Sequence, residues 1–184
     1  MSSFNPVEPK IADADAKAAF EMVQSAFGGI PNLMKMLAIA PNVLKGIMAF
    51  NQEVTGGELE TSLVEQVALL ASGINQCEYC VAVHVHVGQQ AGLSRDELIC
   101  NLQGESSDPK SQAVLNFTRA VVDNRGKVDP LLVNALREQG LSDKAIIEIV
   151  GVIGLYTFLN YVKHLTEPAL DFPAVEEFQP NALV

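Results

Sequence analysis

Apolar residues recur every three or four positions through most of this 184-residue chain, and no stretch alternates with the two-residue period of a β-strand. The chain is 48% hydrophobic but only 6% aromatic, with no Trp, which favours a core of aliphatic side chains packed between helices. The sequence therefore predicts an all-α protein, a helical bundle. Helices are expected at residues 14–27, 32–38, 43–55, 63–71, 75–91, 96–102, 111–122, 130–137 and 145–159.

Capping residues indicate where several of these helices begin and end. Gly-Leu-Ser occurs at residues 92–94 and again at 140–142, and in each copy we expect glycine to end one helix and serine to cap the next. Thr61 or Ser62, with Glu65 three or four residues further on, fits a capping box for the fourth helix. A structural role for Glu65 as a cap is therefore one alternative to a catalytic role.

The length predicts a single domain spanning residues 1–184, because a chain of this size buries enough surface to be stable without disulfide or metal cross-links. The last stretch, from about residue 168 to 184, contains two prolines and is expected to be an extended tail. We expect this tail to lie over the body of the protein or over a neighbouring subunit.

A faint internal repeat runs through the chain. Glu65 stands twelve residues before Cys77, and Glu148 stands twelve residues before Asn160, at the end of another apolar helix. A real repeat would make the chain a duplicated helical hairpin with one active and one structural half. Chance is the alternative, because the pattern consists of one residue type and one spacing.

The charge of the chain argues against two classes of partner. A net charge of −10 makes binding to nucleic acid or to an anionic membrane surface improbable, since both need clustered Lys and Arg. The first ten residues lack the charged and apolar regions of a secretory signal, so a cytoplasmic location is expected. The apolar run at 145–159 contains Glu148 and is shorter than the roughly 18–20 residues of a membrane span, so we interpret it as a buried helix.

One segment carries residues suited to redox chemistry. Cys77, Cys80 and His84 are separated by three and four positions, which places them on one stripe of a helix. Two cysteines at that spacing lie within the reach of a disulfide. A thiol must ionise to attack, and both a helix N-terminus and a nearby imidazole lower its pKa. Glu65, on the preceding helix, is placed to orient the imidazole and to complete a Cys–His–Glu relay.

A zinc-binding or non-catalytic helical module is the alternative from a different class. Cys77 and Cys80 with His84 and His86 supply four candidate zinc ligands, and buried, inert cysteines would serve only for packing. Zinc ligands normally come from two chain segments, and no second Cys/His pair follows at a usual distance, so no metal is expected.

Four other side chains are interpreted as structural. Cys100 is expected to be a packing residue, and His86 and His164 to be ordinary surface or core histidines. Tyr79 lies between the two cysteines but points off their stripe, although its hydroxyl is a candidate donor to the site.

The segment resembles the alkyl hydroperoxidase D and carboxymuconolactone decarboxylase superfamily. Its redox-active members carry Glu, eleven residues, Cys-x-x-Cys, three residues and His, and Glu65, Cys77, Cys80 and His84 match every position. Gly-Ile-Pro-Asn at residues 29–32 also looks like the entry helices of the peroxidase-related branch. The decarboxylase branch lacks the cysteine pair, which argues against a decarboxylase activity here.

The resemblance implies an all-helical enzyme that assembles into trimers or hexamers and reduces a peroxide with electrons from a thiol donor, without a cofactor. By position, Cys80 would be the cysteine nearer the relay of His84 and Glu65 and would attack the peroxide. Cys77 would be the more exposed partner that resolves Cys80 into a disulfide and exchanges with the reductant. The family's best-known members carry a second histidine where this chain has Tyr79, so the resemblance does not specify the proton relay in detail or the donor.

Overall fold

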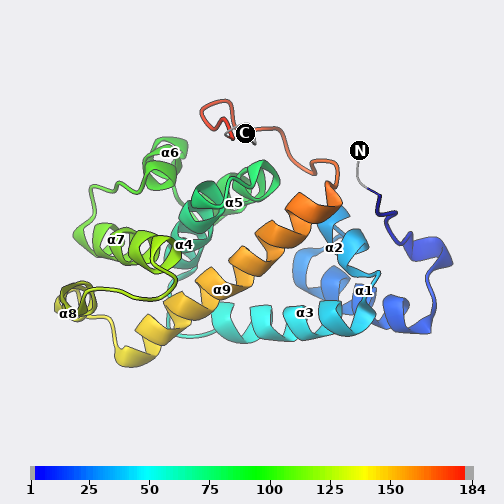
Figure 1. Cartoon of the computed structure of the whole chain (residues 1–184), viewed down its shortest axis with the longest axis horizontal. Coiled ribbons are helices and arrows are strands. Elements are labelled where there is room, and N and C mark those ends of the chain that lie inside the picture. The colour runs from blue at the N-terminus through cyan, green and yellow to red at the C-terminus, as the bar shows by residue number, and fades with distance from the viewer. Residues whose placement is uncertain (1–2, 181–184) are drawn as a thin grey trace.

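The computed structural model describes residues 3–180, and within this range it contains only helices and the segments that connect them (Figure 1). The predicted all-α fold is therefore confirmed. A short 3₁₀ helix, η1 (Pro9–Ile11), precedes nine α-helices in the described part of the chain: α1 (Ala14–Phe27), α2 (Asn32–Leu37), α3 (Pro41–Thr55), α4 (Thr61–Ile74), α5 (Glu78–Gln90), α6 (Arg95–Gln103), α7 (Pro109–Asp123), α8 (Pro130–Glu138) and α9 (Asp143–Thr166).

The long helix α9 lies at the centre of the packing. Figure 1 shows it running diagonally between α1–α3 on one side and α4–α8 on the other, and it packs against α2, α3, α4, α7 and α8. By length and composition alone, its 24 residues would suffice to cross a membrane. The sequence argument that this apolar run is too short for a span is therefore wrong. Instead, its packing within the bundle explains its apolar character, with Ile149, Val152 and Leu155 almost fully buried.

The capping serines are confirmed. Ser94 and Ser142 each accept a hydrogen bond from the backbone N–H three residues further on, at 3.1 and 3.0 Å. Gly92 and Gly140 have φ angles of 93° and 81°, which only glycine adopts without strain. Each Gly-Leu-Ser sequence thus ends one helix and begins the next. Glu148 and Asn160 both lie on the continuous helix α9, whereas Glu65 and Cys77 lie on either side of a turn.

The predicted capping box is wrong, and so is the predicted boundary between the fourth and fifth helices. Glu60 occupies the N-cap position of α4 without a side-chain cap, and the side chain of Glu65 turns inward. The helix continues through Gly73, because glycine at this position lets Leu102 of α6 pack directly against the backbone of α4. The chain breaks only afterwards, where Gln76 has a φ of 59° in the left-handed region.

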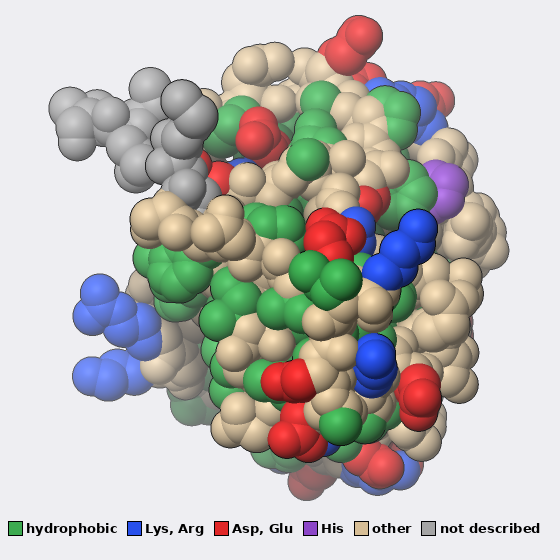
Figure 2. Space-filling model, turned by 90° about the vertical axis from the view of Figure 1, so that its right-hand side faces the viewer, with side chains coloured by type: hydrophobic (Ala, Val, Ile, Leu, Met, Phe, Trp, Pro, Cys, Tyr) green, Lys and Arg blue, Asp and Glu red, His purple; other side chains and the backbone are tan. Residues whose placement is uncertain are grey.

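Charged side chains are mixed over the surface. On the face that Figure 2 shows, acidic and basic side chains lie close to one another, with apolar side chains spread among them. Six ion pairs among the described residues join separate segments, and their basic partners are Lys45, Arg95, Lys110, Arg137, Lys144 and Lys163. The net charge of −10 and this pairing of basic groups both argue against a polyanionic partner.

The C-terminal strap, residues 168–180, follows α9 and crosses the outer side of α5 (Figure 1). Val175 is buried in a small apolar cluster with side chains of α4, α5 and α6, and Phe172 and Phe178 pack against the same cluster. Arg95 at the start of α6 forms an ion pair with Glu177 at 2.8 Å. The strap therefore docks on the helix that carries the cysteines. The rest of the predicted tail, residues 181–184, lies outside the described residues.

Candidate functional site

Cys77 and Cys80 form a disulfide at the beginning of α5, with their Cα atoms 5.3 Å apart. Cys77 is the N-cap of the helix, and its sulfur accepts a hydrogen bond from the backbone N–H of Cys80 at 3.3 Å. The first turn of a helix exposes backbone N–H groups and the positive end of the helix dipole. Such groups stabilise negative charge on a sulfur at this position.

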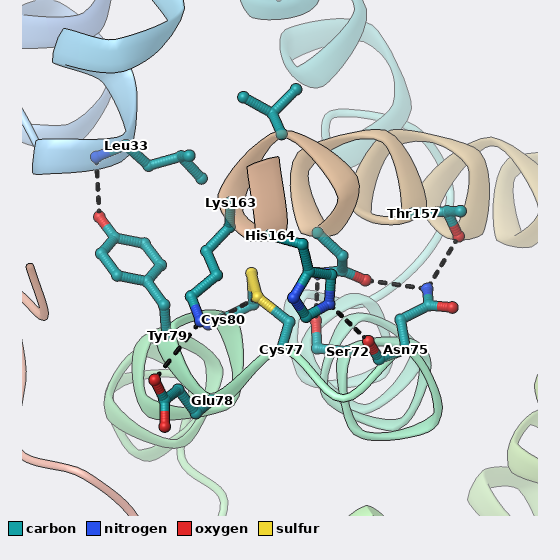
Figure 3. The surroundings of a disulfide bond; sticks show 12 residues. Leu33, Ser72, Asn75, Cys77, Glu78, Tyr79, Cys80, Thr157, Lys163 and His164 are labelled. Carbon is teal, nitrogen blue, oxygen red and sulfur yellow. Dashed lines mark hydrogen bonds and ion pairs between the residues drawn. A yellow bond between two sulfur atoms is a disulfide. The ribbon is translucent and has the colours of Figure 1, made fainter. Parts of the chain in front are cut away.

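The two cysteines differ in what they contact. Cys77 is fully buried, whereas 4% of Cys80 is exposed, and Cys80 lines a cavity of about 410 Å³. The expectation that Cys77 is the more exposed partner is therefore wrong. The physical reason is the position of α9, whose Lys163 and His164 lie over the turn that carries Cys77 (Figure 3). Lys163 bonds to the side chain of Glu78, and His164 bonds to the backbone oxygen of Asn75.

Glu65 and His84 meet across the contact between α4 and α5. His84 Nδ1 lies 2.8 Å from Glu65 Oε2, and only 3% and 6% of these residues is exposed. A carboxylate at that distance accepts a hydrogen bond from Nδ1–H, which favours the tautomer with the proton on Nδ1 and leaves Nε2 on the opposite side of the ring. His84 and Cys80 line the same cavity. An imidazole and one sulfur of the cysteine pair thus line the same cavity, which is large enough for a small molecule.

Tyr156 on α9 completes the surroundings of the histidine. Its ring meets the imidazole of His84 edge-on, with centroids 4.3 Å apart and an interplanar angle of 88°. Burial, and then the negative charge of Glu65, raise the pKa of Tyr156 well above its ordinary value, so the phenol stays neutral. Sequence reasoning missed Tyr156, because it lies 72 residues after His84 and no local pattern connects the two.

A polar network holds the turn that carries Cys77. Asn160 of α9 is fully buried and accepts a hydrogen bond from Asn75 at 2.9 Å while donating one to Ser72 at 3.2 Å. His164 lies 2.7 Å from the backbone oxygen of Asn75. The left-handed backbone that follows is therefore fixed by side chains from a helix distant in sequence.

Replacing Asn160 by alanine is expected to lower the free energy of unfolding by about 1–3 kcal/mol, because the buried hydroxyl of Ser72 and the partly buried amide of Asn75 each lose a hydrogen bond. Urea denaturation of the oxidised protein measures this. The exposed Asn134 provides the matched control, and its alanine variant should unfold within about 0.5 kcal/mol of the wild type. Equal losses in the two variants would contradict the structural role of the network.

The remaining predicted residues do not join the cysteines. Cys100 is exposed on α6, so its interpretation as a packing residue is wrong. The Tyr79 hydroxyl points away from the disulfide and accepts from the backbone N–H of Leu33 at 3.2 Å (Figure 3). His86 is half-buried at the rim of the cavity. Within residues 3–180, no group of three or more His, Cys, Asp or Glu side chains is arranged to hold a metal ion.

The cavity beside Cys80 is mostly apolar. Its walls come from α1 to α5, α9 and the C-terminal strap, and the apolar side chains among them include Phe27, Leu33, Met34, Val83, Leu159 and Phe172. A wider, shallower hollow of about 580 Å³ lies against α1 and contains none of the predicted site residues. The cavity at Cys80 has the size and apolar lining typical of a site for a small organic molecule.

Part of the chain matches a known protein family. Residues 41–123, from the start of α3 to the end of α7, match the carboxymuconolactone decarboxylase family. The matched segment contains Glu65, Cys77, Cys80 and His84. No curated protein matches the chain.

Solved structures show the same fold. An uncharacterized peroxidase-related protein with an alkylhydroperoxidase AhpD core, from Ralstonia eutropha JMP134, superposes with a TM-score of 0.81 at 23% identity over 92% of each chain. The debrominase Bmp8 does so with 0.78 at 18% identity over 93% of each chain, and it is also solved in complex with 2,3,4-tribromopyrrole. An uncharacterized peroxidase-related protein from Silicibacter sp. TM1040 gives 0.75 at 21% identity over 97% of each chain.

Proposed function

We propose that this chain, whose residues 41–123 match the carboxymuconolactone decarboxylase family and whose fold is AhpD-like, is a thiol-dependent oxidoreductase that reduces peroxides. The observation that carries the proposal is the position of Cys80. It is bonded to Cys77, belongs to the same helix as His84, and lines an apolar cavity. The cysteine pair also separates this chain from an acid–base decarboxylase.

The first step uses the reduced protein. His84 Nε2 takes the proton of Cys80, and Glu65 stabilises the resulting imidazolium through Nδ1. The Cys80 thiolate attacks the terminal oxygen of the peroxide, the O–O bond breaks, and the imidazolium protonates the departing alkoxide to an alcohol. Cys80 is then a sulfenic acid.

The second step forms the disulfide. The Cys77 thiolate attacks the sulfur of the sulfenic acid, and hydroxide leaves as water after taking up the proton that Cys77 lost. Two electrons of the thiol pair have then reduced one peroxide to an alcohol and water. Because the 5.3 Å spacing of the Cα atoms already suits the disulfide, this step needs little movement of the backbone.

A thiol donor returns the protein to the reduced state. Two donor thiols are oxidised to a disulfide while Cys77 and Cys80 each regain a proton. Cys77 is fully buried and Cys80 reaches the cavity, so the donor enters through the cavity and exchanges first at Cys80. A small thiol or a slender thiol-bearing arm fits this route. The reducing cytoplasm is the compartment that would supply such a donor.

A homo-oligomer, either a trimer or a hexamer, is part of the proposal. Large apolar side chains remain exposed on α9, among them Ile147, Tyr161 and Leu165, with exposed fractions of 72%, 61% and 64%. Exposed apolar residues in a row along one helix favour contact with another subunit.

Mass spectrometry after peroxide treatment tests the proposed activity. One equivalent of peroxide added to the reduced protein should convert Cys77 and Cys80 into a crosslinked pair and be consumed in equal amount. A Cys100→Ser variant is the control, because an exposed cysteine can oxidise by itself. Peroxide left intact, with no 77–80 crosslink, would exclude the activity. Stoichiometric zinc in protein purified without chelator, lost on mutation of Cys77 or Cys80, would favour the metal-binding alternative.

A second candidate function is the reductive removal of halogen from an aromatic ring. The observation that favours it is the ring-rich cavity at Cys80, together with the likeness in fold to a debrominase. The electrons balance in the same way: two thiols become a disulfide, the ring exchanges bromine for hydrogen, and bromide and a proton are released. Offering 2,3,4-tribromopyrrole in place of peroxide distinguishes the two, since only debromination releases bromide.

A further inference from the structure

The C-terminal strap supplies one wall of the cavity. Phe172 lines the same cavity as Cys80 and stacks on His86 of α5, with ring centroids 4.1 Å apart and planes inclined by 21°. On either side of it the strap is fastened, by Asp171 before it and by the buried Val175 after it. The aromatic wall is therefore held in position from both directions.

The contact that holds the strap just before Phe172 involves Tyr79, which lies between the two cysteines in the sequence. The Tyr79 hydroxyl donates to Asp171 Oδ2, and the same carboxylate oxygen accepts from the backbone N–H of Asn32 at 2.9 Å. Asn32 also donates through its side chain to the backbone oxygen of Ala169 at 3.2 Å. Tyr79 thus connects the start of α5, the start of α2 and the strap.

The Tyr79 hydroxyl keeps its proton at neutral pH and therefore stays a hydrogen-bond donor. Burial, and then the hydrogen bond to Asp171, raise the pKa of its phenol above the ordinary value. This is the position at which the best-known members of the resembling family carry a histidine. In this chain the residue between the cysteines therefore anchors the strap instead of facing the reacting sulfurs.

The size and lining of the cavity at Cys80 favour one class of substrate. Hydrogen peroxide occupies less volume than a pair of water molecules, at about 30 Å³ each in the liquid, whereas the cavity holds about 410 Å³. Aromatic and imidazole rings of Phe27, Tyr79, His86, Tyr156 and Phe172 face this space. An apolar ring stacks well on such walls and displaces water from them, whereas a small polar peroxide does neither.

We propose that the site takes a bulky apolar substrate that carries an aromatic ring, and that Phe172 on the C-terminal strap determines this specificity. This inference rests on the proposed function. Tyr79 acts as a positioning residue, because it holds the strap through Asp171 without touching the substrate's reacting atoms. The strap thereby makes part of the binding site from a segment that lies outside the matched family region.

The test compares two peroxides. The ratio of kcat/KM for cumene hydroperoxide to that for hydrogen peroxide should fall about ten-fold or more in Phe172→Ala, since one lost hydrophobic wall discriminates substrates by this order. Tyr79→Phe keeps the ring but removes the hydroxyl, and should lower the ratio in the same direction. Phe178→Ala is the matched control, because Phe178 belongs to the strap but does not line the cavity. An unchanged ratio in Phe172→Ala, or an equal fall in Phe178→Ala, would overturn the proposal.

Binding of 2-phenylpropan-2-ol, the alcohol that forms from cumene hydroperoxide, separates this proposal from the activity itself. Calorimetry should show binding to the wild type and a Kd at least about ten-fold higher for Phe172→Ala. If the wild type reduces no peroxide but the alcohol binds in this way, the proposed activity fails while the aromatic site stands. If peroxides are reduced but the alcohol does not bind, the aromatic site fails alone.

Discussion

Replacement of Cys80 by serine should lower kcat/KM for peroxide reduction by at least roughly 10³-fold, because a serine hydroxyl does not ionise near neutral pH and is a poor nucleophile toward an O–O bond. Cys80 is also the member of the pair that reaches the cavity. Stopped-flow measurement of peroxide consumption by the reduced protein provides the rate. The Cys100→Ser variant should retain the wild-type rate, since Cys100 lies exposed on α6, away from the cavity.

The Cys77→Ser variant distinguishes attack from resolution. It retains the proposed nucleophile, so it should consume one equivalent of peroxide and accumulate a sulfenic acid at Cys80 that dimedone traps. Without a donor thiol in the assay, consumption should stop at this one equivalent, because the variant has no second cysteine beside Cys80 to form the disulfide. If Cys77→Ser loses the first turnover and Cys80→Ser keeps it, the proposed order of the two cysteines is reversed.

Removal of the base is expected to have the second large effect. His84→Ala should lower kcat/KM by about 10²–10⁴-fold, the range that general acid–base groups contribute. Glu65→Gln should lower it by roughly 10²-fold, because the amide preserves the shape of the side chain but does not stabilise the imidazolium with a negative charge. The pH dependence of Cys80 alkylation by iodoacetamide in the reduced protein measures the same effect without peroxide. Both variants should need a higher pH to reach a given alkylation rate.

The control for the Glu65 variant lies on the neighbouring turn. Glu60→Gln removes an exposed carboxylate that pairs with Lys110 at 3.0 Å, and it should leave the rate unchanged. Because Glu65 is buried against His84, the Gln variant also needs an unfolding measurement. A slower rate only in proportion to the fraction of unfolded protein would assign Glu65 a structural role and contradict the relay.

The fold could be predicted from the sequence almost completely, because helical periodicity is a local property. The first predicted helix matches α1 residue by residue, and both Gly-Leu-Ser junctions cap as expected. The boundary before Cys77 was predicted too early. Ser72-Gly73 is a typical helix end, but here Gly73 accommodates Leu102, a contact between helices that no local signal reports.

The stripe of Cys77, Cys80 and His84 follows from the sequence by itself, since positions three and four apart on a helix share a face whatever the rest of the chain does. Only the tertiary structure decided which sulfur faces the cavity and where the carboxylate of Glu65 points, because both depend on how α4 and α9 pack against α5. It also decided that Phe172, far along the chain, becomes a wall of the site. Side-chain spacing along one helix is set by backbone geometry, whereas contacts between segments distant in sequence are set by burial and shape over the whole core.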